Sequence, residues 1–171
     1  AAVKGVGLAA VKAIIDERNA NGAFKDIYDF VERVNLSACN RSAIENLAMA
    51  GAFDSFGKAR EIYVQPMFNS TYSDMLVKYG QSVQNDRNSM QMSLFGDLEP
   101  IETNRPPYPD YDKWSQMALL NKEKELVTMY LSAHPLDPYA MELRFACNTT
   151  CDEFAVREEK PGVVTLGGLV T

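Results

Sequence analysis

The chain has 171 residues, of which 46% are hydrophobic and 23% charged. This composition is that of a globular protein and excludes collagen-like, mucin-like and wholly disordered chains, and the length suits one medium domain or two small ones. The sequence contains no apolar run of about 18 residues or more, so we expect no membrane span, and its start carries no pattern typical of a secretion signal.

The formal net charge is −6, which taken alone argues against a nucleic-acid-binding protein. The charge is unevenly distributed, however. Residues 1–60 carry eight Lys and Arg against seven Asp and Glu, whereas residues 61–171 carry nine against sixteen. If any part of the chain binds a polyanion, the sequence predicts that it is the first part.

The three cysteines, Cys39, Cys147 and Cys151, are too few and too scattered for a disulfide framework. Cys147 and Cys151 have only His134 nearby as another soft ligand, whereas a structural zinc site needs four ligands. We therefore expect reduced thiols and no metal site, which suits a cytoplasmic protein. Adjacent carboxylates such as Asp152-Glu153 lack a framework for nucleotidyl transfer, so we also expect no catalytic residue.

The first 60 residues predict short helices. The spacing of Leu8, Val11, Ile14 and Ile15 gives one helix an apolar face, and residues 19–22 end it. Asp26 is a candidate N-cap for the next helix, and either Asn40 or Ser42 can cap a third that stops near Gly51. The inward-facing side chains of the second and third helices are expected to be Ile27, Phe30, Val31, Val34, Ile44, Leu47 and Ala48.

The rest of the chain is less regular. Pro66 should interrupt a helical segment over residues 58–84, leaving a helix near residues 69–80 that carries Tyr72, Leu76 and Tyr79. Residues 85–112 are polar and proline-rich, which is typical of a linker. A helix is expected over residues 113–131. A turn follows at His134, with Asp137 capping a helix that starts at Pro138, and a β-strand is expected from residue 162 to the end.

Lys4-Gly5-Val6-Gly7 is the first motif that suggests a ligand. Two glycines permit a tight turn and a close backbone approach, and the amide groups at the start of the following helix favour an anion. Lys4 adds a positive charge. Asn40, Arg41 and Ser42 follow a second helix and turn in a similar layout without glycine. Both segments are candidates for binding phosphate, and the alternatives are a plain turn for Gly5–Gly7 and a solvated surface charge for Arg41.

These segments, together with Ala50-Gly51-Ala52-Phe53-Asp54 and the block His134-Pro135-Leu136-Asp137-Pro138-Tyr139, resemble the α-subunit family of bacterial replicative DNA polymerase III. The resemblance covers nearly the whole chain. It implies a tandem helix-hairpin-helix region that binds the backbone of double-stranded DNA without sequence preference. It also implies that the catalytic residues and the Mg²⁺ of the parent polymerase lie elsewhere, that this region holds no cofactor, and that other domains of the same polymerase are its neighbours.

Gln91-Met92-Ser93-Leu94-Phe95 forms an apolar island in the predicted linker. It resembles the pentapeptide with which bacterial polymerases bind the β sliding clamp. Leu94 and Phe95 suit an apolar pocket, and Gln91 offers both a donor and an acceptor. The alternative is that these side chains pack onto the chain's own helices.

We therefore expect a mainly α fold built on a tandem helix-hairpin-helix bundle over residues 1–60. A helical extension (61–84), a linker with the clamp-binding peptide (85–112), a helical connector (113–160) and the first strand of an OB-fold (161–171) should follow. The expected function is DNA binding and clamp tethering during replication. A helical spacer without a ligand and a repair-type helix-hairpin-helix protein are the alternatives.

Overall fold

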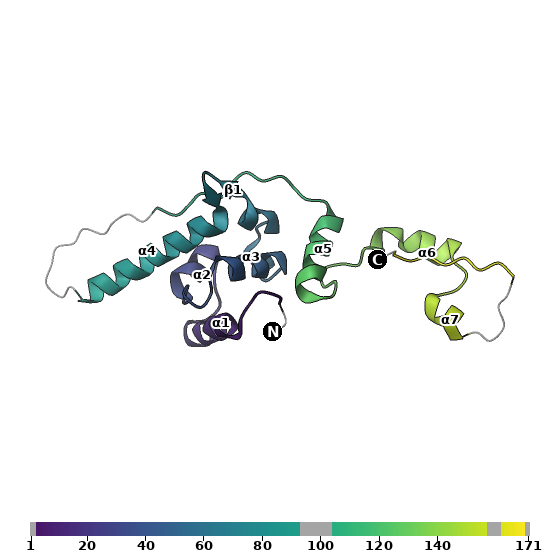
Figure 1. Cartoon of the computed structure of the whole chain (residues 1–171), viewed down its shortest axis with the longest axis horizontal. Helices are drawn as coiled ribbons and strands as arrows, with labels where there is room; N and C mark the ends of the chain where they lie inside the picture. The colour runs from purple at the N-terminus through teal and green to yellow at the C-terminus, as the bar shows by residue number, and fades with distance from the viewer. Residues whose placement is uncertain (1–2, 93–103, 157–161, 170–171) are drawn as a thin grey trace. The chain divides into compact units, whose positions relative to one another are not determined.

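The structure is a computed structural model that describes residues 3–92, 104–156 and 162–169 (Figure 1). The chain divides into two compact units, Ala1–Met129 and Tyr130–Thr171. The first unit is mainly helical, and the second contains three short helical segments among its described residues. Within the described residues the strands form one two-stranded antiparallel hairpin, which lies in the first unit. The predicted mainly α fold is confirmed.

The first three helices form where local signals place them. They are α1 (Leu8–Asn21), α2 (Ile27–Arg33) and α3 (Arg41–Met49). Gly22 ends α1 with a φ of 81°. The Asp26 side chain caps α2 by accepting the Asp29 N–H at 2.8 Å. Asn40, and not Ser42, caps α3, because its side chain accepts the Ala43 N–H at 3.0 Å.

The core of the first unit lies between α2, α3 and the later helix α4 (Tyr72–Met92). The inward-facing side chains predicted for α2 and its C-cap are almost fully buried, and so are Ile44 and Ala48 on α3. Aromatic rings fill much of the remaining space. Phe53 contacts both Phe30 and Phe56, with ring centroids 5.0 and 5.5 Å apart.

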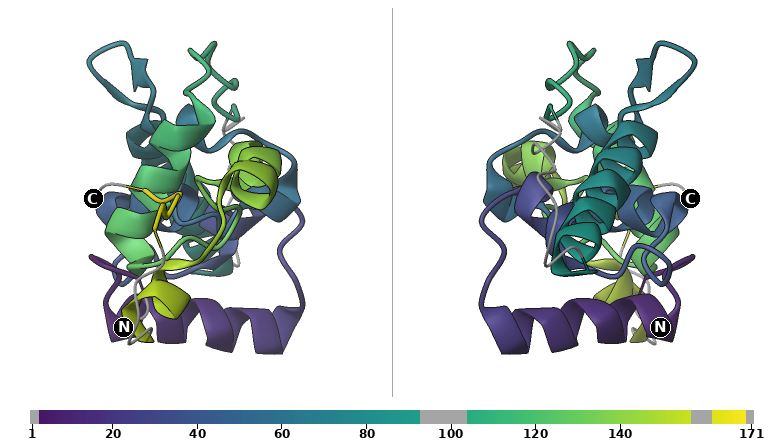
Figure 2. Two further views of the ribbon diagram at one scale, coloured as in Figure 1. Left: turned by 90° about the vertical axis from the view of Figure 1, so that its right-hand side faces the viewer. Right: turned by 90° about the vertical axis from the view of Figure 1, so that its left-hand side faces the viewer.

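Only part of the predicted apolar face of α1 is buried. Ala10 is buried, and Val11 and Ile14 pack partly against the core. Leu8 and Ile15 instead remain 76% and 50% exposed. The reason is the position of α1, which lies at one end of the unit, beneath the other helices in Figure 2.

Between α3 and α4 the chain forms two 3₁₀ turns, η1 (Asp54–Phe56) and η2 (Arg60–Val64), and then a hairpin of β1 (Pro66–Met67) and β2 (Ser70–Thr71). Pro66 does interrupt the helical segment as predicted. The hairpin was not predicted, and neither was the absence of α-helix before Tyr72. Phe68 and Asn69 form its two-residue turn, since Met67 pairs with Ser70.

The helix α4 continues to Met92, so the predicted linker does not begin at residue 85. Tertiary contacts explain the difference. The Gln84 side chain donates to the carbonyl oxygens of Val31 and Val34, both at 2.9 Å, and Arg87 pairs with Glu32 at 3.4 Å. These contacts hold polar turns of α4 against α2.

The later part of the predicted linker is also anchored to the first unit where it is described. The Pro106 carbonyl accepts the Tyr28 hydroxyl at 2.7 Å. The Tyr108 ring packs against Tyr28 and Tyr72, with centroid distances of 5.5 and 5.9 Å. These contacts join residues 104–108 to the core.

Helix α5 (Gln116–Val127) is shorter than predicted, because Ser115 caps it by accepting the Ala118 N–H at 3.2 Å. Its buried Glu123 pairs with Arg60 at 3.3 Å, and Arg60 also binds Asp54. This arrangement places α5 in the first unit, whereas the sequence suggested a connector running from residue 113 to 160.

The second unit contains η3 (Asp137–Tyr139), α6 (Ala140–Ala146) and α7 (Cys151–Val156). His134 stabilises a turn as predicted, since its Nδ1 accepts the Leu136 N–H at 3.2 Å. Asp137 does not cap a helix at Pro138. Its carboxylate accepts the His134 N–H at 2.7 Å, and α6 begins only at Ala140.

The predicted strand from residue 162 is not formed over the described residues 162–169. Thr165 instead bonds to Asn148, which accepts the Thr165 N–H at its Oδ1 at 3.0 Å and donates its own N–H to the Thr165 carbonyl at 3.2 Å. A lone extended segment has no second strand to complete a ladder.

Candidate nucleic-acid interface

The loop before α1 has the geometry of a tight hairpin. Gly5 has a φ of 76°, a region that side chains rarely adopt, and Gly7 caps α1 in an extended conformation with a φ of −72°. Val6 is buried between them and anchors the loop in the core, whereas Lys4, Gly5 and Gly7 are exposed. The loop therefore presents its backbone and one cation to solvent.

Two neighbouring elements hold this loop in place. The Lys4 N–H donates to the Leu126 carbonyl on α5 at 2.8 Å. On the other side the Asn46 side chain of α3 lies so close to Gly5 that a Cβ there would overlap its amide nitrogen. The loop conformation is thus determined by tertiary contacts as well as by its glycines.

The start of α1 is suited to an anion. Gly7 makes no side-chain cap hydrogen bond, and no acidic residue occurs in the first turn. The first helical hydrogen bond runs from the Val11 N–H to the Gly7 carbonyl at 3.2 Å. The preceding amides of an α-helix have no helical acceptor and lie at the positive end of its dipole. They can donate to a phosphate oxygen.

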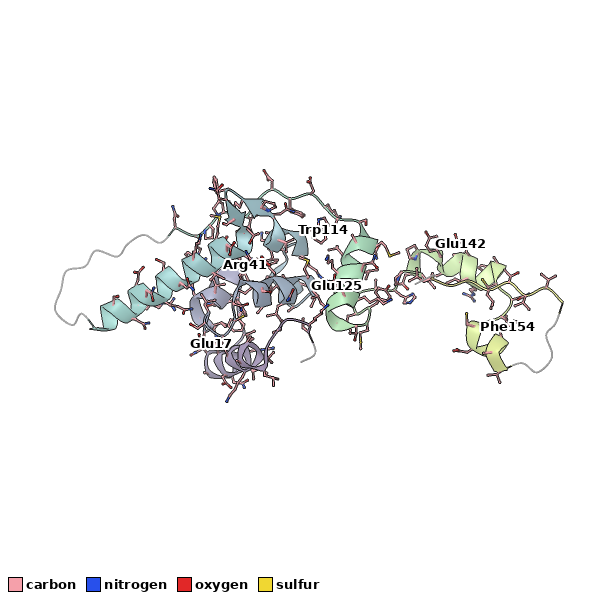
Figure 3. The ribbon with its side chains drawn as sticks, viewed as in Figure 1. Glu17, Arg41, Trp114, Glu125, Glu142 and Phe154 are labelled. Atoms are coloured by element: carbon pink, nitrogen blue, oxygen red, sulfur yellow. The ribbon has the colours of Figure 1, made fainter. Side chains whose placement is uncertain are left out.

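The second predicted site is built differently. Asn40, Arg41 and Ser42 do lie together at the start of α3, and all are exposed. The Asn40 side-chain oxygen is already used as the cap. Arg41, labelled in Figure 3, forms ion pairs with Asp74 at 3.0 Å and Glu45 at 3.6 Å. The Asp74 hydrogen bond raises the pKa of Arg41 above its usual value, and the two carboxylates offset its charge.

Lys12 is a candidate that the sequence analysis did not single out. It is exposed one turn beyond the loop, on the same side of α1 as Leu8. The structure shows no hydrogen bond or ion pair between its side chain and the described residues. The signal available in the sequence was its position four residues after Leu8, which places both residues on one face of the helix. Lys4 and Lys12 together make the first loop more cationic than the second.

The predicted clamp-binding peptide is only partly described. Gln91 and Met92 are the last two residues of α4. Ser93, Leu94 and Phe95 lie outside the described residues.

Two further observations concern the described part of the chain. No group of three or more His, Cys, Asp or Glu within it could hold a metal ion. Among the same residues, no helix is long and apolar enough to span a bilayer.

Comparison with known proteins agrees with the geometry of the loop. The profile of the helix-hairpin-helix motif matches residues 1–63. The chain is 40% identical over 143 residues to the DNA polymerase III subunit alpha of Caulobacter vibrioides, which covers 84% of this chain and 12% of that protein. It is 33% identical over 170 residues to the corresponding subunit of Pasteurella multocida, which covers 99% of this chain and 14% of that protein.

A similar match extends to the DNA polymerase III subunit alpha of Deinococcus radiodurans, with 33% identity over 165 residues. The chain thus spans about one eighth of the length of these relatives, 12 to 14% of each. These matches confirm the resemblance found in the sequence: the chain carries a helix-hairpin-helix motif and is homologous, over most of its length, to one segment of the DNA polymerase III α-subunit family.

Proposed function

We propose that the first unit binds the sugar–phosphate backbone of double-stranded DNA without sequence preference, in the course of DNA replication. The observation that carries this proposal is the start of α1, where uncapped amides, Lys4 and the absence of a first-turn carboxylate occur together. Contacts to phosphate carry no base information, so binding should not depend on sequence. The relatives are named as subunits of DNA polymerase III, which supports a nucleic-acid ligand.

Gly7→Val is the variant that tests this site. No atom lies within 4 Å of a Cβ built at Gly7, and its φ suits any residue, so the fold should be retained. A valine side chain would nevertheless stand where a phosphate must approach. Gly168→Val is the matched control, because its Cβ is also unobstructed and it lies in the second unit.

Binding to a fluorescent duplex should be measured by anisotropy across a salt series. The wild-type affinity should fall with salt by about one log–log unit for each phosphate contacted, and Gly7→Val should remove most binding. Lys4→Gln and Lys12→Gln should each lower the slope by about one unit. A wild-type chain without salt-dependent binding would instead favour the helical spacer, which the net charge of −6 also favours.

The second hairpin should contribute less, because Arg41 must leave Asp74 and Glu45 to contact a phosphate. Arg41→Gln should therefore change the salt slope by less than Lys4→Gln does. An equal or larger change would mean that both hairpins bind with similar strength.

The peptide Gln91–Phe95 is proposed to bind the β sliding clamp. A short peptide that becomes ordered on docking should bind with modest, roughly micromolar affinity. When one chain binds both DNA and the clamp, each binding event raises the effective local concentration for the other. Two weak contacts linked in this way promote processive synthesis. The test is calorimetric titration with the clamp, using Leu94→Ala/Phe95→Ala as the control. No binding by the wild type at about 100 μM would contradict the proposal.

The parent protein is proposed to be a DNA-directed DNA polymerase that uses Mg²⁺, as the names of the relatives suggest. The residues described here do not fit that metal, because no suitable ligand group occurs among them. The chain by itself should therefore not incorporate nucleotides. A primer-extension assay that shows incorporation by the purified chain would contradict this.

A further inference from the structure

The tip of the β1–β2 hairpin carries an unusual residue. Phe68 is 91% exposed and has a φ of 55°. It occupies the first position of the two-residue turn, where hairpins with positive φ carry glycine. A bulky aromatic residue in this conformation is rare and costs stability.

No internal role explains Phe68. The ring takes part in none of the aromatic or cation–π contacts among the described residues, although most aromatic rings of the first unit do. Glycine or asparagine at this position would form the turn with less strain. An exposed ring kept at a strained turn is better explained by contact with another molecule.

The base of the hairpin is attached to the start of α3. The Thr71 hydroxyl donates to Glu45 at 3.2 Å, and the Thr71 N–H donates to Asp74 at 3.4 Å. Asp74 in turn binds Arg41 at 3.0 Å. The hairpin therefore projects from the second predicted phosphate site, at the opposite end of the unit from α1 (Figures 1 and 2).

The charges around the hairpin are compatible with DNA. Residues 62–73 contain no charged side chain, so the hairpin itself does not repel phosphates. The carboxylates that contact the base of the hairpin, on Glu45 and Asp74, are paired with Arg41. Next to Phe68, the exposed Asn69 has an amide that can donate to the acceptors in the minor groove.

We propose that Phe68 is a wedge that enters the minor groove of duplex DNA and partly unstacks one base step. This inference rests on the proposed backbone binding, because the loops before α1 and α3 must first bring the duplex to this surface. Apolar side chains act in this way in other minor-groove proteins, where unstacking kinks the duplex toward the major groove, away from the inserted side chain. Insertion should favour easily deformed steps without reading bases directly.

The test uses the purified chain and a duplex with 2-aminopurine at a central TA step. Binding by the wild type should raise the 2-aminopurine fluorescence, since unstacking relieves quenching. Phe68→Gly removes the ring and suits the positive φ of the turn, so the fold should be retained. It should abolish the fluorescence rise and weaken binding about three- to tenfold, without changing the salt slope, because no charge is lost.

Two further variants sharpen the result. Phe68→Trp retains an aromatic wedge and should keep most of the fluorescence rise. Tyr111→Ala removes an exposed ring elsewhere in the first unit and should behave as wild type. If Phe68→Gly gives wild-type affinity and fluorescence, the wedge is wrong while backbone binding stands. If the wild type shows no salt-dependent binding, both proposals fail.

Discussion

The Asn46 side chain lies against Gly5 and takes the space that a Cβ at Gly5 would need. The two residues come from different hairpins, since Gly5 belongs to the loop before α1 and Asn46 to α3. Gly5 is therefore required by the fold itself, whereas Gly7 faces open space. A loss of DNA binding in a Gly5 variant can therefore come from damage to the fold, whereas the same loss in a Gly7 variant points to the binding surface.

Gly5→Ala should destabilise the first unit by about 1–3 kcal/mol, because it adds both a left-handed alanine and a clash. Gly7→Ala should change the free energy of unfolding by less than about 0.5 kcal/mol. Urea unfolding followed by circular dichroism measures both. The second change Asn46→Ala should recover part of the loss in Gly5→Ala by making room. Equal stabilities for the two single variants would show that Asn46 does not constrain the loop.

Glu123→Ala should be strongly destabilising. Glu123 is 1% exposed and pairs with Arg60, so its removal leaves a largely buried guanidinium without one of its carboxylates. Breaking a buried pair in this way costs about 3–5 kcal/mol, at the lower end here because Asp54 still binds Arg60. The matched control is Glu125→Ala on the same helix, whose exposed pair with Lys122 is worth less than about 1 kcal/mol. Similar urea midpoints for the two variants would contradict this account.

The tyrosine cluster predicts a loss of stability at alkaline pH. Burial raises the pKa of Tyr108 to about 12 and raises the pKa values of Tyr63 and Tyr72 further. In the unfolded chain these phenols ionise at about pH 10, the ordinary value for tyrosine. Above that pH the unfolded state binds fewer protons than the folded state, so the free energy of unfolding falls as pH rises.

Urea midpoints at pH 8, 10 and 11 should therefore decrease, with most of the change above pH 10. Tyr108→Phe removes one titrating group and should make the decrease shallower. Tyr111→Phe is the control, since Tyr111 is exposed outside the cluster. A steeper decrease in Tyr108→Phe than in the wild type would reverse the expected sign.

Cys39 should be protected from thiol reagents. It is completely buried, and burial raises the pKa of its thiol to about 11. The reactive thiolate is therefore scarce at neutral pH as well as inaccessible. Ellman's reagent should label Cys147 and Cys151 in the native protein and Cys39 only in denaturant. Cys39→Ala should leave the native count unchanged, and a lower native count in that variant would mean that Cys39 is accessible.

The elements that were predicted correctly carry local signals. Asp26 and Asn40 each accept the amide three residues later, a contact that depends only on neighbouring residues. The β hairpin was missed because its turn, Phe68-Asn69, lacks the glycine on which such predictions depend. The length of α4 was missed because Gln84 gains its bonding partners from α2, which is far away in sequence.

The local structure at the candidate site was predicted, whereas the ion pairs around it were not. The glycines of Lys4–Gly7 indicated a loop at a helix start, and the structure shows one. Glu45, four residues along the same helix, is a partner of Arg41 that the sequence spacing allows, but Asp74 is not, because it reaches Arg41 only after α4 has folded onto α3. Charge compensation across tertiary contacts has no signature in a single sequence, and it makes the second hairpin the weaker candidate.

The hydrogen bond from the Lys4 N–H to the Leu126 carbonyl joins two residues close to the two ends of the first unit. The chain therefore enters and leaves the first unit at neighbouring positions. Such a domain can be inserted into a longer polypeptide without stretching either connection.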